Sequence, residues 1–333
     1  MQRVQRQDWI DVARGIGIIL VVFGHVLRGT VKAGIVPDTS ATQWVDFGLY
    51  TFHMPLFFFL AGLNLPGSLR RGRVPFLQAK LWTIGLPYVI WTFIQGSVMI
   101  LLAQDINTHV TPADLLAFPY RPLGPLWFLY ALLICHVLAA MIPDRRLFAA
   151  IAAAGFVIFF QLPEVPSLAL TLHNLPFYLA GAYAGHAVAA WRTPVSLSGI
   201  ALIWTGFALA VVGAWTVSGF SPMALAALPA CCLGILGVVW VSKRIGGGAL
   251  ATVGLLSLSI FVMHSLAAAG LRVAMTRLHV PPDPMVYLIS GTAFGILGPM
   301  LAHRLLARWN TLSVLGLGAP AWRDRVAVSD TAR

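Results

Sequence analysis

A stretch of fifty residues, 193–242, contains no Asp, Glu, Lys or Arg. Charged residues make up 10% of the 333-residue chain, whereas a soluble domain has roughly 25%. A helix of about 20 apolar residues crosses a bilayer, and Pro222 divides this stretch in two, so it predicts two consecutive membrane spans. Similar apolar segments recur along the chain. We therefore predict an all-α fold, a polytopic membrane helical bundle embedded in a lipid bilayer.

Ten segments are predicted to span the membrane. They are residues 10–28, 45–64, 82–103, 124–142, 147–163, 170–190, 198–217, 223–242, 250–270 and 284–303. We expect these segments to form one transmembrane domain over residues 1–308. The remaining residues, 309–333, are predicted to be a polar cytoplasmic tail that is partly disordered.

Basic residues predict the orientation, because they are enriched in cytoplasmic loops. With the N-terminus inside, sixteen of the 22 Lys and Arg residues fall on the cytoplasmic side and five on the outer side. Both termini are then cytoplasmic. The net charge of +11 sits in clusters between apolar segments, without aromatic interleaving or a recognition motif. We therefore predict no nucleic-acid partner.

The three cysteines, Cys135, Cys231 and Cys232, all fall within apolar segments. No CxxC or Cys/His ligand spacing is present, so we expect buried, inert thiols, no disulfide framework and no metal site. The chain also has no GxSxG elbow, Walker loop or HExxH motif.

The first apolar segment carries three polar groups that are costly in lipid: Asp11, Arg14 and His25. Ten residues lie between Arg14 and His25, so the two positions are eleven steps apart on a helix. Eleven steps make about three helical turns plus 20°, so both side chains lie on one stripe, roughly 16 Å apart. Neutral imidazole can act as a general base near pH 7, and His25 is the strongest candidate. Arg14 could neutralise an anionic group or orient a carbonyl. Alternatively it pairs with Asp11 in a purely structural role.

His53 lies in the second segment at a depth comparable to that of His25, so both could face one cavity, which a kink at Pro55 would help to open. Basic residues gather in the following inner loop and at its end. They are Arg70, Arg71, Arg73 and Lys80. The preference for cytoplasmic positive charge explains their presence, but arginine also binds phosphate in two-pronged fashion. We predict that they contact a phosphate-bearing ligand.

Aromatic residues open the fourth segment from the outer side. Trp127 and Tyr130 are either interface anchors or a stacking surface for a sugar ring. His264 is another intramembrane histidine near the outer end of the ninth segment, and we include it with these two as a substrate-binding candidate. His136 and His173 have no partner in the sequence pattern, so we expect structural roles for them.

These blocks, in this order, resemble the integral membrane acyltransferase 3 family, the O-acyltransferases that modify bacterial surface sugars. WIDVARGIGIILVVFGHV carries the family's Arg-x10-His pattern at Arg14 and His25. FHMPLFFFLAG is similar to the second helix of the fucose 4-O-acetylase-like branch. FLQAKLWTIGLPYVIW, GPLWFLYALL and SLSIFVMHSL follow at familiar places. The third helix departs from the family, since Lys80 and Thr83 stand where two arginines are common.

The resemblance implies a multi-pass enzyme of the bacterial inner membrane. It would transfer an acetyl or other acyl group from cytoplasmic acetyl-CoA, a substrate rather than a permanently bound cofactor, to a hydroxyl of an extracytoplasmic or lipid-linked carbohydrate. Polysaccharide assembly proteins or a second copy of the chain are possible partners. Two other functions fit the same pattern: a transporter or flippase for a polar solute or lipid-linked sugar, and a catalytically silent subunit of a polysaccharide export machine.

Overall fold

The structure is a computed structural model that describes residues 8–102, 110–161, 166–191 and 196–318, and within these ranges it contains helices and connections but no strand. The helices are α1 (Asp8–Lys32), α2 (Ser40–Leu63), α3 (Leu65–Leu69), α4 (Arg73–Lys80), the π-helix η1 (Leu81–Gly85), α5 (Leu86–Leu101), α6 (Pro112–Leu116), the 3-10 helix η2 (Gly124–Leu126), α7 (Trp127–Met141), α8 (Arg145–Phe159), α9 (Pro166–Ala190), α10 (Leu197–Ser218), the 3-10 helix η3 (Leu225–Ala227), α11 (Leu228–Ile245), α12 (Ala249–Leu255), α13 (Ser257–Arg277) and α14 (Pro284–Arg308).

Helices cover the predicted spans within the described residues, with 250–270 divided between α12 and α13, and this confirms the all-α membrane bundle. Within the described ranges, eight helical segments are long and apolar enough to cross a membrane. The fifth predicted span, α8, has 15 residues, about 22 Å at 1.5 Å per residue, which is short of a hydrocarbon core of about 30 Å. The sixth predicted span lies on α9, a continuous helix whose apolar sequence contains the polar residues His173 and Asn174.

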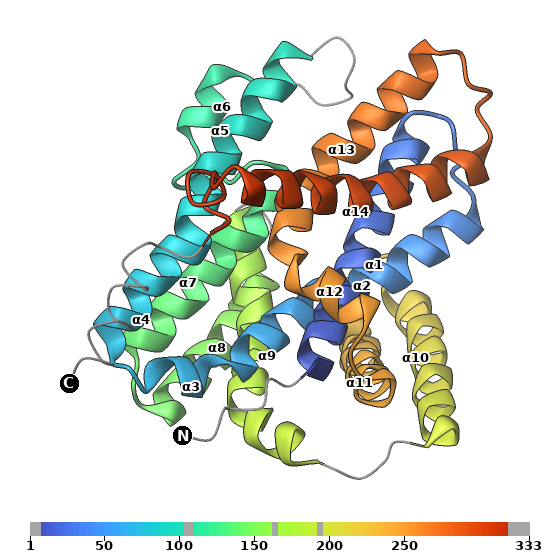
Figure 1. The fold of residues 1–333 in the computed structure, drawn as a ribbon. Coiled ribbons are helices and arrows are strands. Elements are labelled where there is room, and N and C mark those ends of the chain that lie inside the picture. Colours follow the sequence, from blue (N-terminus) through green and yellow to red (C-terminus); the bar gives the residue numbers. More distant parts are fainter. Residues whose placement is uncertain (1–7, 103–109, 162–165, 192–195, 319–333) are drawn as a thin grey trace.

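Helix α1 lies at the centre of the molecule and packs against α2, α11, α12, α13 and α14 (Figure 1). Its contact with α12 is a direct approach of two backbones. A Cβ atom added at Gly254 would lie 1.7 Å from the carbonyl oxygen of Asp11, and one added at Gly15 would lie 2.1 Å from that of Leu250. Small residues permit this approach in membrane bundles, so these glycines fix the position of α12 on α1.

A second pair of glycines brings α2 and α9 together. A Cβ atom at Gly62 would lie 1.9 Å from the carbonyl oxygen of Tyr178, and one at Gly181 would lie 2.0 Å from that of Phe59. Because α9 packs closely along α2, much of its surface is buried by protein rather than by lipid. This burial accounts for the polar His173 and Asn174 within α9, both of which are buried.

Helices α4 and α5 are joined without a break through the π-helix at Leu81–Gly85. The amide of Leu86 bonds to the carbonyl of Leu81, five residues earlier. Proline at position 87 has no N–H group to bond to the carbonyl of Thr83, which frees that carbonyl from the α-helical pattern. A π-turn of this kind often marks a functional region.

Beyond α14, the start of the predicted tail packs against α5. The indole nitrogen of Trp91 donates a hydrogen bond to the carbonyl of Leu315 at 3.1 Å. Gly316, with φ at +69°, lies against Pro87, where a Cβ atom would come within 2.9 Å of the proline nitrogen. Helix α14 thus carries the chain across α1 and α13 to α5 (Figure 1). Residues 319–333, the rest of the predicted tail, lie outside the described residues.

Candidate active site

Three histidines from three helices converge at one end of α1. The Nε2 atom of His264 on α13 lies 3.4 Å from Nδ1 of His25 on α1, and their ring centroids are 5.0 Å apart. His53 on α2 joins them through Tyr50, whose ring centroid is 4.5 Å from that of His53 and 6.3 Å from that of His25. The structure therefore brings together His25, His53 and His264, which we predicted separately.

Backbone carbonyls indicate the tautomer of each ring. Nδ1 lies near a carbonyl oxygen three or four residues earlier in the same helix, at 2.9 Å for His25, 2.6 Å for His53 and 2.6 Å for His264. A carbonyl can only accept, so Nδ1 of a neutral ring carries the proton and donates it. The Nε2 atom of each histidine is then left as a proton acceptor.

His25 differs from the other two because it is accessible. His53 and His264 are 1% and 0% exposed, whereas His25 is half-buried. If Nε2 of His25 takes up a proton, its Nδ1–H faces two acceptors, the carbonyl of Val21 and Nε2 of His264. The hydroxyl of Ser265 lies 3.2 Å from that same Nε2 of His264. His25 therefore has acceptors on its Nδ1 side, and its Nε2 is the position that can take up a proton.

A second polar layer covers the histidines, and our sequence analysis missed it. Arg28 donates two hydrogen bonds to Asp46, at 2.6 Å from Nε and 2.7 Å from Nη2. Its guanidinium also lies 3.1 Å from the centroid of the Tyr50 ring. Residues 46, 50 and 53 recur at helical spacing on one face of α2, and this stripe was the signal that could have revealed the layer.

Asp11 and Arg14 form an ion pair at the opposite end of α1. Nη1 of Arg14 lies 3.3 Å from Oδ1 of Asp11, whose side chain is 6% exposed. This is the structural pairing that the sequence left open. The pair lies beside α12, about 16 Å along the helix from His25 by the helical rise. Arg14 therefore does not join the histidine cluster.

The predicted phosphate-binding residues lie on and before α4. Arg70, Arg71 and Arg73 are exposed at the junction of α3 and α4. Lys80, at the end of α4, lies 5.5 Å from the centroid of the Phe76 ring, on which His136 stacks at 5.6 Å. Arg73 and Lys80 are seven helical steps apart, which is about two turns, so they share one face of α4.

Trp127 and Tyr130 pack against aromatic neighbours. Trp127 stacks on Phe58 with ring centroids 6.4 Å apart and an interplanar angle of 21°. Tyr130 lies 5.7 Å from Tyr88. Both are half-buried, and neither contacts His25 through a ring interaction in the described part of the chain. Their contacts in the structure are packing contacts with other aromatic side chains, whereas His264 lies beside His25.

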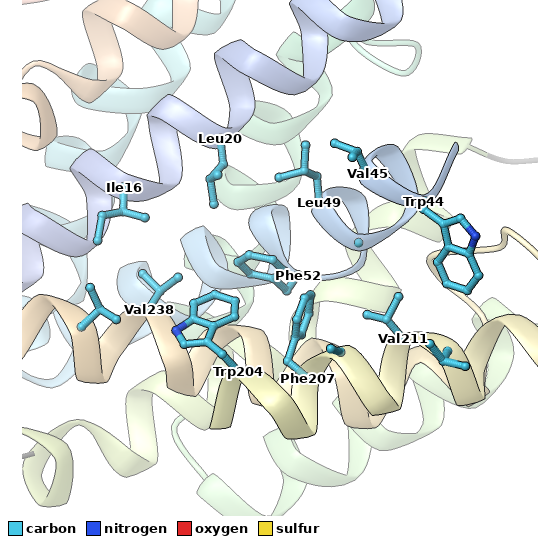
Figure 2. Close-up of a pocket in the computed structure, with 14 residues that line it drawn as sticks. Ile16, Leu20, Trp44, Val45, Leu49, Phe52, Trp204, Phe207, Val211 and Val238 are labelled. Atoms are coloured by element: carbon cyan, nitrogen blue, oxygen red, sulfur yellow. The ribbon is translucent and has the colours of Figure 1, made fainter. Parts of the chain in front are cut away.

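An apolar groove of about 600 Å³ opens between α1, α2, α10 and α11 (Figure 2). Its lining includes Ile16, Leu20, Leu49, Phe52, Trp204 and Phe207. No titratable side chain lines it, and Ile16 lies half a helical turn around α1 from His25. The groove suits a hydrocarbon chain, and the chemistry of proton transfer lies elsewhere.

Another cavity, of about 760 Å³, follows the π-helix. Its lining residues are Gln78, Leu81, Trp82, Gly85, Leu86, Tyr88, Val89 and Leu133. The indole nitrogen of Trp82 is buried and has no hydrogen-bond partner among the described residues. The cavity therefore has a largely apolar wall with one amide side chain, that of Gln78.

The cysteines do not take part in either site. Cys135 and Cys231 are buried as predicted, but Cys232 is exposed on α11, which corrects our prediction that all three are buried. The cause is helical geometry, since adjacent residues point about 100° apart and only one can face the core. Within the described ranges, no three His, Cys, Asp or Glu side chains are grouped to hold a metal ion.

Helices long and apolar enough to cross a membrane surround a cluster of three histidines, which is the arrangement of a polytopic membrane protein with a polar site between its helices. The comparison with known families is specific: the chain belongs to the acyltransferase family whose model, described as an acyltransferase domain, matches residues 7–304. No solved structure matches the chain.

Three curated relatives are 25–28% identical to parts of the chain. Nodulation protein NolL of Sinorhizobium fredii is 28% identical over 186 residues, which is 53% of this chain and 48% of the relative. NolL of Mesorhizobium japonicum is 26% identical, over 51% of this chain and 46% of the relative. Inner membrane protein YcfT of Escherichia coli is 25% identical, over 63% and 65%. The chain thus matches about half of the length of the two NolL proteins.

Proposed function

We propose that this protein is an O-acyltransferase of the bacterial inner membrane that moves an acetyl group from cytoplasmic acetyl-CoA to a carbohydrate hydroxyl on the outer side. The observation that carries the proposal is the geometry of His25: an accessible imidazole with Nδ1 bound to a carbonyl and Nε2 available as a base. Family membership supports the acyl transfer. Acetyl, rather than another acyl group, rests on the resemblance to sugar O-acetylases.

In the proposed reaction, Nε2 of His25 takes the proton of the acceptor hydroxyl while its oxygen attacks the thioester carbonyl carbon. The C–O bond forms, the C–S bond breaks, and the thiolate of coenzyme A leaves. His25 then returns its proton to the thiolate, so the base is regenerated. His264 keeps the ring oriented and accepts a hydrogen bond from the protonated His25.

We assign the donor to the side of α4. The exposed arginines at positions 70, 71 and 73 and the charge of Lys80 would hold the phosphates of coenzyme A. The cavity along the π-helix would take part of the pantetheine arm, whose amide groups could bond to the side chain of Gln78. Arg14 and Asp11 pair with each other within α1 in this proposal, rather than taking part in catalysis.

The test compares the full-length protein with His25→Gln in proteoliposomes containing labelled acetyl-CoA and a glycan acceptor. We expect the wild type to produce acetylated acceptor and free coenzyme A together, and His25→Gln to lose at least a hundredfold in rate. His303→Gln is the matched control, because His303 is also on a membrane helix and bonds to Ser259 at 2.7 Å.

Equal rates for His25→Gln and the wild type would refute the role of His25. Movement of a glycan across the vesicle without consumption of acetyl-CoA would instead favour the transporter. Unchanged acetylation in cells that lack the protein would favour a silent subunit.

A further inference from the structure

Arg272 on α13 contacts α1 next to the histidine cluster. Its Nη1 atom donates a hydrogen bond to the carbonyl oxygen of Gly29. Gly29 follows His25 by four residues, about one turn or 6 Å along α1, and the two residues share a face of that helix. The guanidinium is therefore anchored about one helical turn beyond His25 along α1.

The charge of Arg272 is not balanced by a carboxylate in the described ranges of the chain, where the ion pairs join other residues. Asp46 binds Arg28 at two atoms, and Asp283 accepts from the amide of Val286 at the start of α14. Arg272 is half-buried. A partly desolvated cation that faces a neutral carbonyl has unused capacity for an anion.

Capping of α1 does not account for Arg272. The carbonyl of Gly29 already accepts the amide of Ala33 at 3.2 Å. The next carbonyl, that of Thr30, accepts the amide of Ile35 at 3.0 Å. Since the last turn of α1 is satisfied by its own backbone, the helix would end in the same way without the arginine.

Building on the proposed function, we infer that Arg272 binds an oxyanion carried by the acceptor and so holds the reacting hydroxyl before His25. The oxyanion is either a phosphate that links the sugar to a lipid carrier or the carboxylate of an acidic sugar. Both match the forked geometry of a guanidinium. Arg28, which is already engaged by Asp46, forms a wall of this subsite rather than its anchor.

The experiment measures the midpoint of thermal unfolding of the full-length protein in detergent, with inorganic diphosphate or with glucuronate and without acetyl-CoA. We expect at least one of these anions to raise the midpoint of the wild type. Arg272→Gln should bind that anion about tenfold more weakly or worse, because it loses a charged hydrogen bond. Arg272→Lys should retain part of the response. Arg277→Gln, with the same charge loss on the same helix, should keep all of it.

A response to diphosphate alone supports the phosphate-linked acceptor, and a response to glucuronate alone supports the acidic sugar. The inference is overturned if neither anion acts on the wild type, or if Arg272→Gln responds like the wild type, even when its midpoint without anion is lower. Acyl transfer that depends on His25 but not on Arg272 would refute only the subsite. Anion binding that depends on Arg272 in a protein without transferase activity would refute only the proposed function.

Discussion

The contact between α1 and α12 allows a quantitative test of the packing that supports the site. In Gly254→Ala, the new Cβ atom would start 1.7 Å from the carbonyl oxygen of Asp11, whereas real Cβ contacts stay beyond 3.0 Å. The obstacle is backbone, so no side chain can rotate away. Helix α12 must therefore retreat from α1 by more than 1 Å.

The cost follows from that retreat. A gap of about 0.5–1 Å forfeits a quarter to a half of each dispersion contact, and overpacked sites typically lose about 1–3 kcal/mol of unfolding free energy. The better helix propensity of alanine returns up to about 1 kcal/mol. We expect a net loss of about 1–2 kcal/mol, which lowers the unfolding midpoint in detergent by several degrees.

Gly213→Ala is the matched control, because its Cβ atom would meet nothing within 4 Å in the middle of α10. Its midpoint should stay the same or rise. Gly15→Ala offers a second check, since its Cβ atom would lie 2.1 Å from the carbonyl of Leu250 in the same interface. The double variant at positions 15 and 254 should lose less than the two single losses added together. Equal midpoints for Gly254→Ala and Gly213→Ala would refute the backbone contact.

Two further tests concern single hydrogen bonds. Gln95→Leu removes a buried hydrogen bond of 2.7 Å from Nε2 to the carbonyl of Val262, which joins α5 to α13. We expect the unfolding free energy to fall by about 1 kcal/mol and hydrogen exchange in α13 to become faster. Unchanged exchange would contradict this. Hydrogen bonds from the hydroxyl and amide of Thr111 lower the pKa of Asp114. The carboxylate therefore stabilises α6 at pH values above its unfolded pKa of about 4, and this stabilisation is lost as the pH falls below that value. Exchange of residues 112–117 should therefore quicken at acid pH in the wild type, after correction for the intrinsic rate, and Asp114→Ala should lack this step.

The class of fold could be predicted from the sequence because a bilayer leaves an apolar segment little choice except a helix. The surroundings of each helix could not, since hydropathy does not show whether protein or lipid covers it. Helix α9 tolerates His173 and Asn174 because α2 packs beside it, and that contact depends on Gly62 and Gly181 meeting backbones far away in sequence.

The candidate site divides in the same way. His25 could be chosen as a candidate because a polar residue in an apolar helix is costly without a purpose. Its pairing with His264 could not, because 239 residues separate them and no local pattern links α1 to α13. Asp46, Tyr50 and His53 lie at helical spacing in the sequence, so their shared face of α2 could be predicted. The position of Arg272 could not, because it depends on how α13 packs against α1.

The π-helix at Leu81–Gly85 has a consequence for how this protein can diverge. A π-turn holds one more residue than the α-turn it replaces, and one residue turns a helix by about 100° and advances it by 1.5 Å. The direction in which Lys80 and the rest of α4 face, relative to α5, is therefore encoded in chain length as well as in side-chain identity. Deletion of one residue between positions 81 and 85 would rotate the whole basic face of α4 while every residue on it stayed the same. Within this family, an alignment gap at this point would mark a change of geometry that substitution patterns alone cannot show.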